Sequence, residues 1–210
     1  MNTEKLDCLR QKIRCNLSAD RYEHTLGVER AVVFIGERIL PHKLYELRVA
    51  ALLHDITKEM PYADQKHFLA TEGVQLTCDD VMSEKTLHQL SGAKMAEKSF
   101  SDYITPEIIH AISCHSTGCA DMSVFDEILY LADYVEDTRR HESCIALRNR
   151  LLDELKKSSA EDYVQVLHKI CLESINQTIE HLIQKGGFVH SNSFAARAFL
   201  VEKLNNGSRE

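Results

Sequence analysis

The chain has 210 residues, a length at which one hydrophobic core is expected, so we interpret residues 1–210 as a single domain. Hydrophobic residues make up 44% and charged residues 27%, and the formal net charge of −7 argues against a protein that grips nucleic acid through a basic face. The low counts of 8 Gly and 3 Pro argue against a β-rich fold with many tight turns.

The first residues are polar and lack the apolar stretch of a signal peptide, and no segment approaches the roughly 20 apolar residues of a membrane span. The 7 cysteines are an odd number without C-x-x-C spacing. We therefore expect a cytoplasmic protein with free thiols and no membrane partner. Cys114 and Cys119 flank His115 and raise the question of zinc, but the lack of further clustered cysteines favours buried free thiols.

Hydrophobic periodicity predicts helices from the first third of the chain onward. Residues 20–40 place five apolar side chains on one helical stripe: Val28, Ala31, Val32, Ile35 and Ile39. Asp20 is predicted as the N-cap of this helix, with Glu23 completing a capping box, and Pro41 marks its end. A second helix is predicted to begin near Leu44 and to run to the dipeptide His54-Asp55.

The remaining helices follow from the same pattern. They are predicted from Pro61 to Gly73, over 84–100, from Pro106 to Gly118, in the run that starts at Asp121 and carries Asp133, and over 145–157, 160–185 and 192–204. No alternating strand pattern competes with them. The sequence thus predicts an all-α helical bundle, with a core over about 20–140 and a C-terminal helical brace and closing loop over about 145–205.

The candidate chemistry depends on several histidines together, because a lone histidine on an apolar face is more often a core residue than a ligand. There are 11 histidines, and His54 directly precedes Asp55. Adjacent helical residues point about 100° apart, so both reach one ion only where a helix is ending. An imidazole and a carboxylate suit iron, manganese, cobalt, zinc or magnesium, and other helices of a bundle would have to supply further ligands.

Five segments occur in one order along the chain: RYEHTLGV (21–28), ALLHDITK (51–58), HQLSGA (88–93), ISCHSTG (112–118) and YLADYVEDTR (130–139). This order resembles the bacterial HD-type symmetrical bis(5′-nucleosyl)-tetraphosphatases, which belong to the HD phosphohydrolases. The resemblance covers residues 20–140, and GGFVHSNSFAAR (186–197) is similar to the closing loop and helix of that family. It implies an HD-type helical bundle with a metal site between the core helices.

The resemblance also implies the roles of individual residues. An iron-like ion would be held by His24, His54, Asp55 and Asp133, with manganese, cobalt, zinc or magnesium as alternatives. The catalytic set would be His54, Asp55, His88 and His115, and the last two would either bind a second metal bridged by Asp55 or donate hydrogen bonds to phosphate.

The implied substrate contacts surround the same centre. Arg21, Lys58 and Arg139 would neutralise the polyphosphate, and the metal-site residues Asp55, His88, His115 and Asp133 would also touch it, as would Ile56, Thr57 and Ser116. The nucleoside would contact a loop made of Gly187, Phe188, Val189 and His190. The reaction would be hydrolysis of diadenosine tetraphosphate to two ADP by metal-activated water.

Part of this interpretation stands without the resemblance. Cleavage of a phosphoanhydride needs a nucleophile at neutral pH, and a metal can lower the pKa of bound water from about 15.7 towards 7. Cations must then stabilise charge on the phosphate oxygens. Arg21 lies one helical turn before His24, and Lys58 follows Asp55 by three residues, so each cation lies near a proposed ligand.

The sequence departs from the family at two loops, and alternatives stay open. After Arg139 the family usually has an acidic residue or histidine, an aromatic residue and Pro-Gly, whereas this chain has Arg140-His141-Glu142-Ser143. Ser191 stands where the family usually has a proline. One alternative is another HD-type nucleotide phosphohydrolase or phosphodiesterase. Another is a nucleotide-sensing module without catalysis. In each case the expected partner is a small-molecule nucleotide, and a homodimer is a further expectation.

Overall fold

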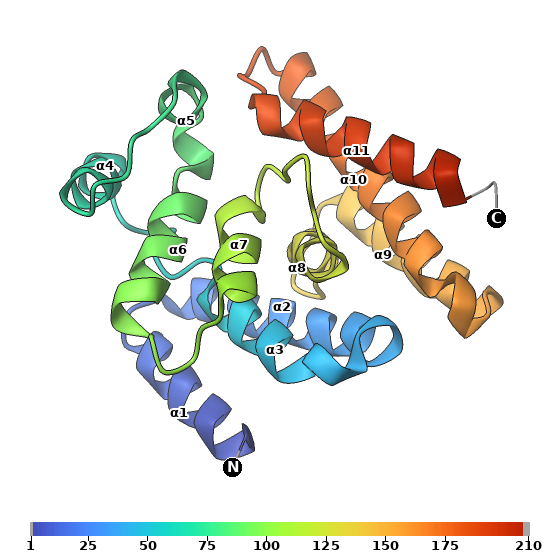
Figure 1. The fold of residues 1–210 in the computed structure, drawn as a ribbon, viewed down its shortest axis with the longest axis horizontal. Coiled ribbons are helices and arrows are strands. Elements are labelled where there is room, and N and C mark those ends of the chain that lie inside the picture. The colour runs from blue at the N-terminus through green and yellow to red at the C-terminus, as the bar shows by residue number, and fades with distance from the viewer. Residues whose placement is uncertain (1, 208–210) are drawn as a thin grey trace.

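The structure, a computed structural model, describes residues 2–207, and this part of the chain contains helices and loops but no β-strand (Figure 1). The predicted all-α fold is confirmed. The α-helices are α1 (Asn2–Arg14), α2 (Ala19–Ile39), α3 (Leu44–Leu53), α4 (Tyr62–Thr71), α5 (Cys78–Met82), α6 (His88–Ser99), α7 (Pro106–Cys114), α8 (Val124–Val135), α9 (Glu142–Lys157), α10 (Tyr163–Gln184) and α11 (Ser191–Gly207). Three short 3-10 helices cover Pro41–Lys43, Glu84–Thr86 and Ala160–Asp162.

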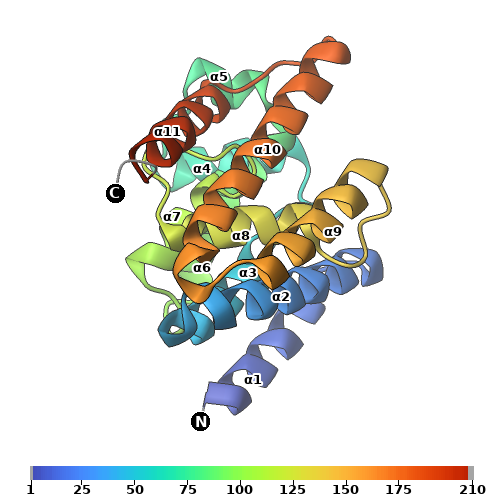
Figure 2. The same cartoon turned by 90° about the vertical axis from the view of Figure 1, so that its right-hand side faces the viewer.

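Helix α8 lies at the centre of the bundle and packs against α2, α3, α7, α9 and α10 (Figures 1 and 2). Its sequence is apolar on most faces, so it is stable only when other helices surround it. It begins with a capping box, in which Ser123 accepts from the backbone N–H of Asp126 while the Asp126 carboxylate accepts from the backbone N–H of Ser123. Its C-terminal half carries Asp133 towards the middle of the molecule.

The start of α2 differs from the prediction. Ser18, not Asp20, is the N-cap, since its backbone is extended and its hydroxyl accepts from the N–H of Arg21 at 3.2 Å. Asp20 lies in the first turn, and Glu23 is an exposed residue that pairs with Arg30, so the predicted capping box is wrong. The helix begins earlier because Ser18 is itself held by Glu59, which accepts from the backbone N–H of Ser18 at 2.8 Å.

Two helices were not predicted at all. Helix α1 buries Leu6, Leu9 and Ile13, and Arg10 of this helix bonds to the buried Glu29 of α2. The short α5 begins with a capping box formed by Thr77 and Asp80. The helix predicted over 84–100 begins instead at His88, after the 3-10 turn at Glu84–Thr86.

Helices α9, α10 and α11 occupy the part of the chain for which the sequence predicts a C-terminal brace. Helix α10 packs against α8, α9 and α11 (Figure 2). It buries a hydrogen bond in which the His168 ring donates to Glu127 of α8 at 2.7 Å. The brace therefore contacts the helix that carries Asp133. Among the described residues, no helix is both long enough and apolar enough to cross a membrane.

Candidate metal centre and active site

His54 and Asp55 lie in the turn that directly follows α3. Both are buried, with exposed fractions of 0% and 3%. The Nε2 atom of His54 is 3.5 Å from Oδ2 of Asp55, and the Nε2 atom of His24 on α2 is 3.7 Å from the same oxygen. The two adjacent residues thus meet at one point in the way that the end of a helix allows.

Asp133 of α8 completes this group. Its Oδ1 atom lies 3.0 Å from Nε2 of His24 and 3.9 Å from Nε2 of His54. Residues from α2, α8 and the turn after α3 therefore converge, and His24, His54 and Asp133 present ligand atoms within 4.8 Å of one another. Two imidazole nitrogens and two carboxylates make a mixed donor set suited to a divalent transition metal.

The histidine rings are oriented so that their Nε2 atoms face the centre. Backbone carbonyls can only accept, so the Nδ1 atoms of three rings must donate: His54 to Ala51 at 2.7 Å, His88 to Lys85 at 2.9 Å, and His115 to Ile112 at 2.8 Å. His24 instead uses a carboxylate, with Nδ1 at 3.1 Å from Oε1 of Glu136. A proton on Nδ1 leaves the lone pair on Nε2, which is the ligand form of histidine.

Several polar atoms at this point have no hydrogen-bond partner among the described residues, although they are buried. They are Nε2 of His24, Nε2 of His54 and Oδ1 of Asp55. Burial of polar atoms without partners costs free energy, and such atoms call for an explanation. A cation bound between them would satisfy all of them, so the residues present fit a metal.

The second oxygen of Asp55 faces another pair of histidines. Oδ1 lies 3.1 Å from Nε2 of His88 on α6 and 3.6 Å from Nε2 of His115, which directly follows α7. The two Nε2 atoms are themselves 3.1 Å apart, and the hydroxyl of Ser116 is 3.1 Å from Nε2 of His88. Asp55 thus lies between two histidine pairs, one at each carboxylate oxygen.

The ionisation of these groups reflects their close packing. Burial by itself would raise the pKa of Asp55 and Asp133, but the neighbouring imidazoles at Asp55, and Arg139 with the imidazoles at Asp133, hold both pKa values well below the ordinary range. Burial lowers the pKa of His88 to about 4, which keeps this ring neutral. Both carboxylates are therefore anionic and available to a cation at neutral pH.

The three predicted cations all lie at the centre. Arg21 donates to Oδ2 of Asp55 at 2.7 Å, and Arg139 donates to Oδ1 of Asp133 at 2.6 Å. Lys58 places Nζ 3.0 Å from Nε2 of His88, and its burial lowers the pKa of the ammonium group. Positive charge therefore surrounds the carboxylates, as an anionic substrate would require.

Other residues of the predicted site lie in different surroundings. Thr57 is 1% exposed, and its hydroxyl is within 2.8 Å of the Ser91 hydroxyl and donates to the carbonyl of His88 at 3.2 Å. Ile56 and Thr57 line a separate cavity of about 440 Å³ to which none of the metal-site residues contributes. Thr57 thus holds α6 against the turn at His54 through bonds inside the protein.

The closing loop contacts α5. His190 is buried with Nε2 at 3.3 Å from Oδ1 of Asp80, and the backbone N–H of Ser191 donates to Asp79 at 2.8 Å. Phe188 is 41% exposed. Within residues 2–207, no hydrogen bond or ion pair joins Gly187, Phe188, Val189 or His190 to the side chains around Asp55, so their contact with a nucleoside stays a prediction.

Two functional neighbours were missed by sequence reasoning. Glu136 is 1% exposed and accepts from His24, and the signal for it was its position one helical turn after Asp133. Gln89 accepts from the backbone N–H groups of Ser116 and Thr117 at 3.1 and 3.2 Å and so holds the loop after His115. Gln89 follows His88 directly, but nothing in the sequence indicated its partner.

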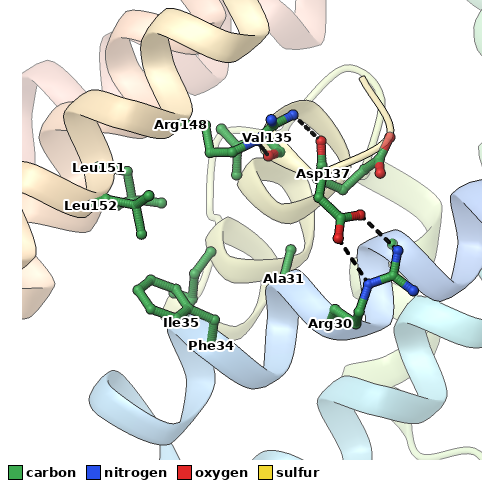
Figure 3. A pocket seen from close by; sticks show the side chains of 11 residues that line it. Arg30, Ala31, Phe34, Ile35, Val135, Asp137, Arg148, Leu151 and Leu152 are labelled. Carbon is green, nitrogen blue, oxygen red and sulfur yellow. Dashed lines mark hydrogen bonds and ion pairs between the residues drawn. The ribbon is translucent and has the colours of Figure 1, made fainter. Parts of the chain in front are cut away.

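Two cavities flank the centre. One of about 490 Å³ is bordered by Tyr134, Arg139, His141 and residues near the end of α10, and Arg139 joins it to Asp133. The other, of about 170 Å³, lies between α2, the end of α8 and α9 (Figure 3). Its wall is mainly apolar, with the ion pair of Arg30 and Asp137 at its edge and Glu136 in its lining (Figure 3).

Comparisons with known proteins agree with this geometry. The chain is 28% identical over 202 residues to the symmetrical bis(5′-nucleosyl)-tetraphosphatase of Bacillus subtilis, covering 96% of this chain and 98% of that protein. It is 26% identical over 196 residues to the protein of the same name from Staphylococcus aureus, covering 92% and 91%.

A solved structure and a family match extend this result. The crystal structure of a predicted HD superfamily hydrolase involved in NAD metabolism from Clostridium acetobutylicum superposes with a TM-score of 0.81 at 30% identity, covering 94% of this chain and 97% of that one. Residues 21–138 match the HD domain family, whose members hold a divalent metal. The resemblance seen in the motifs is confirmed, and because the match spans more than half of the chain, this protein belongs to the HD domain family.

Proposed function

We propose that this protein is a metal-dependent hydrolase that cleaves diadenosine tetraphosphate symmetrically to two ADP. The observation that carries the proposal is the position of Asp55, whose two oxygens face His24 with His54 on one side and His88 with His115 on the other. The names of the Bacillus and Staphylococcus relatives support the substrate, since the chain covers nearly all of both proteins.

The centre would hold its metal through His24, His54, Asp55 and Asp133, and the bound ion would activate water and polarise a phosphate oxygen. Arg21 and Arg139 already contact Asp55 and Asp133, so they are positioned to exchange these partners for phosphate oxygens when substrate binds. Burial lowers the pKa of His88 and keeps its ring neutral, and its Nδ1 atom donates to the carbonyl of Lys85, so the Nε2 lone pair is suited to bind a second ion.

We further propose iron as the resident metal, with manganese, cobalt, zinc and magnesium as alternatives. The nitrogen and oxygen donors contain no thiolate, and imidazole combined with carboxylate suits first-row metals such as iron. A second ion would be held by His88 and His115 with Asp55 as the bridge. Metal analysis of the purified protein, with and without His88→Ala, tests both the identity and the number of ions.

The nucleoside is proposed to bind beside Arg139. The cavity of about 490 Å³ there is bordered by Tyr134 and by the end of α10, which leads into the loop of Gly187, Phe188, Val189 and His190. Arg139 would contact the phosphates between the metal centre and this cavity. We also propose that Ser116, Ile56 and Thr57 contact the substrate.

The decisive experiment is to incubate the purified protein with diadenosine tetraphosphate and each metal and to resolve the nucleotides formed. ADP as the sole product supports symmetrical cleavage, whereas AMP with ATP contradicts it. Asp55→Asn should abolish turnover, and Asp137→Asn is the matched control because Asp137 pairs with Arg30 outside the centre.

The same assay separates the alternatives. Faster turnover of nucleoside monophosphates, cyclic nucleotides or guanosine polyphosphates would favour another HD-type activity. Nucleotide binding without turnover across all metals would favour a sensing module. We also propose a cytoplasmic location, which the seven free cysteines support, and a homodimer, which sedimentation would test.

A further inference from the structure

A second group of ligand-type side chains lies outside the HD centre, at the end of α7. His110, Cys114 and Cys119 place their ligand atoms within 4.8 Å of one another. Nε2 of His110 is 4.0 Å from Sγ of Cys119 and 3.9 Å from Oδ1 of Asp121. A nitrogen and two sulfurs therefore gather around one point, and the Asp121 carboxylate lies beside the His110 ring at its edge.

The local fold explains why these residues meet. His110 and Cys114 are four residues apart on α7, so their side chains lie on the same face of the helix. The chain then turns back at Gly118, which has a φ of 71° and donates its N–H to the carbonyl of Cys114 at 2.8 Å. This turn returns Cys119 and Asp121 to the face of α7 that carries the first two residues.

His110 is held in the orientation that a metal ligand needs. Its Nδ1 atom lies 3.0 Å from Oδ2 of Asp126, a carboxylate that is buried in the capping box of α8. A carboxylate at Nδ1 fixes the proton there and leaves Nε2 free to bind, which is the usual outer support of a zinc-bound histidine. The free Nε2 atom is the one that faces Cys119 and Asp121.

Cys114 is a buried free thiol as predicted, whereas Cys119 is less buried than the sequence suggested. Cys114 is 4% exposed, but Cys119 is only half-buried, and the Asp121 side chain is 81% exposed, so an ion can reach the group from solvent. The argument against zinc rested on the lack of further cysteines. Here the remaining ligands are a histidine and an aspartate, which zinc accepts equally well.

We propose that His110, Cys114, Cys119 and Asp121 form a zinc site, separate from the HD centre and structural in kind. In a tetrahedral site with the usual zinc bond lengths, ligand atoms lie about 3.4 to 3.8 Å apart, so the observed separations close by small side-chain movements. Cys114 and Cys119 bind as thiolates and release two protons when the ion enters. Four protein ligands leave no open position for a substrate.

The zinc site would affect the HD centre through His115, the residue that follows Cys114 in the chain. Cys114 directly precedes His115, and Ser116 and Thr117 connect both clusters along one short segment. A zinc ion would join the end of α7 to the loop after Gly118 and so hold the segment that carries His115. Its role would be to stabilise this segment, and no step of the proposed hydrolysis uses it.

Cobalt substitution tests the proposal, because of the two proposed sites this one has thiolate ligands and the HD centre has none. The reduced, metal-free protein is titrated anaerobically with Co²⁺, and the absorbance is followed. We expect a sulfur-to-cobalt charge-transfer band in the near ultraviolet and bands of tetrahedral cobalt in the visible. The absorbance of these bands should stop rising when one Co²⁺ ion is bound at this site. Zn²⁺ should remove them by displacement. Their absence in the titrated wild-type protein would overturn the proposal.

Variants locate the bands. Cys119→Ser should remove most of the charge-transfer intensity, and Asp121→Asn, at an exposed position that should not affect folding, should shift the visible bands. Cys15→Ser, which changes an exposed cysteine on the surface, should leave the spectrum unchanged. Asp55→Asn should alter cobalt binding at the HD centre but keep the charge-transfer band. An undiminished charge-transfer band in Cys119→Ser, or unshifted visible bands in Asp121→Asn, would contradict this ligand set.

Discussion

The Nδ1 atom of His24 lies 3.1 Å from Oε1 of Glu136, so one ring of the metal centre is held by a side chain from the other end of the HD segment. Glu136 is almost fully buried and also accepts from the hydroxyl of Thr138 at 2.7 Å. The burial of Glu136 raises its pKa and the bond from His24 lowers it, and the net effect is a lowered pKa. An anionic carboxylate therefore holds the ring of His24, a proposed metal ligand, through its Nδ1 atom.

Glu136→Gln should weaken metal binding by about 10- to 100-fold, because loss of an outer-shell carboxylate lowers the basicity and the fixation of the ligand. Metal affinity measured by competition with a chromophoric chelator checks this result. Asp137→Asn is the matched control, since it changes the next carboxylate, which pairs with Arg30. Equal affinities of Glu136→Gln and the wild type would show that His24 does not need this partner.

Gly27→Ala, a change on α2, should also disrupt the contact between His24 and Glu136. A Cβ atom at Gly27 would overlap Oε2 of Glu136, so the carboxylate would have to move away from His24. We expect weaker metal binding together with a loss of about 1–3 kcal/mol in unfolding free energy from overpacking. Gly36→Ala is the contrast, because its Cβ would meet Leu47, away from the centre. That variant should lose stability but keep metal affinity.

Glu59→Gln should reduce the loss of stability in acid. The hydrogen bonds from Ser18 lower the pKa of Glu59 in the folded state below its ordinary value of 4.5. A carboxyl group with a depressed folded pKa adds stability above its unfolded pKa, and that stability disappears as the pH falls through the folded pKa. Urea unfolding at neutral and acidic pH should show a smaller drop in the variant. An identical drop would mean that this bond does not contribute.

His168→Leu should destabilise the brace by about 3 kcal/mol, since it leaves the buried carboxylate of Glu127 without its partner. The burial that raises the pKa of Glu127 shows how poorly this position solvates a charge. The double variant with Glu127→Leu should recover much of the loss, because two apolar side chains replace the pair. Chemical denaturation measures both. A double variant less stable than His168→Leu would contradict this account.

The sequence predicted the features that depend on local pattern or on the order of the motifs. The helical run that starts at Asp121 predicted α8, which the structure begins at Val124, and the apolar residues before His54 predicted α3. It did not predict α1, since the contact that fixes this helix, from Arg10 to Glu29, joins residues that have no common pattern. It also placed the N-cap of α2 at Asp20, because the support that Glu59 gives to Ser18 is visible only in three dimensions.

The same limit applied to the candidate site. His24, His54, Asp55 and Asp133 were found because each lies in a recognisable segment, and the structure brings them together. Glu136 lay in one of those segments without an assigned role. His110 and Asp121 were not predicted as ligands, because Cys114 and Cys119 have no further cysteines near them and His110 lies four residues before Cys114 without any motif.

Three of the four rings at the HD centre are oriented by a carbonyl three residues earlier in the chain: His54 by Ala51, His88 by Lys85 and His115 by Ile112. These bonds need only the adjoining turn, so each can form as soon as that turn does. The docking of α2 against α8, which brings His24 to Glu136, is the long-range step. The orientation of three rings is therefore set locally, before any ion arrives, whereas His24 is oriented only when α2 docks against α8.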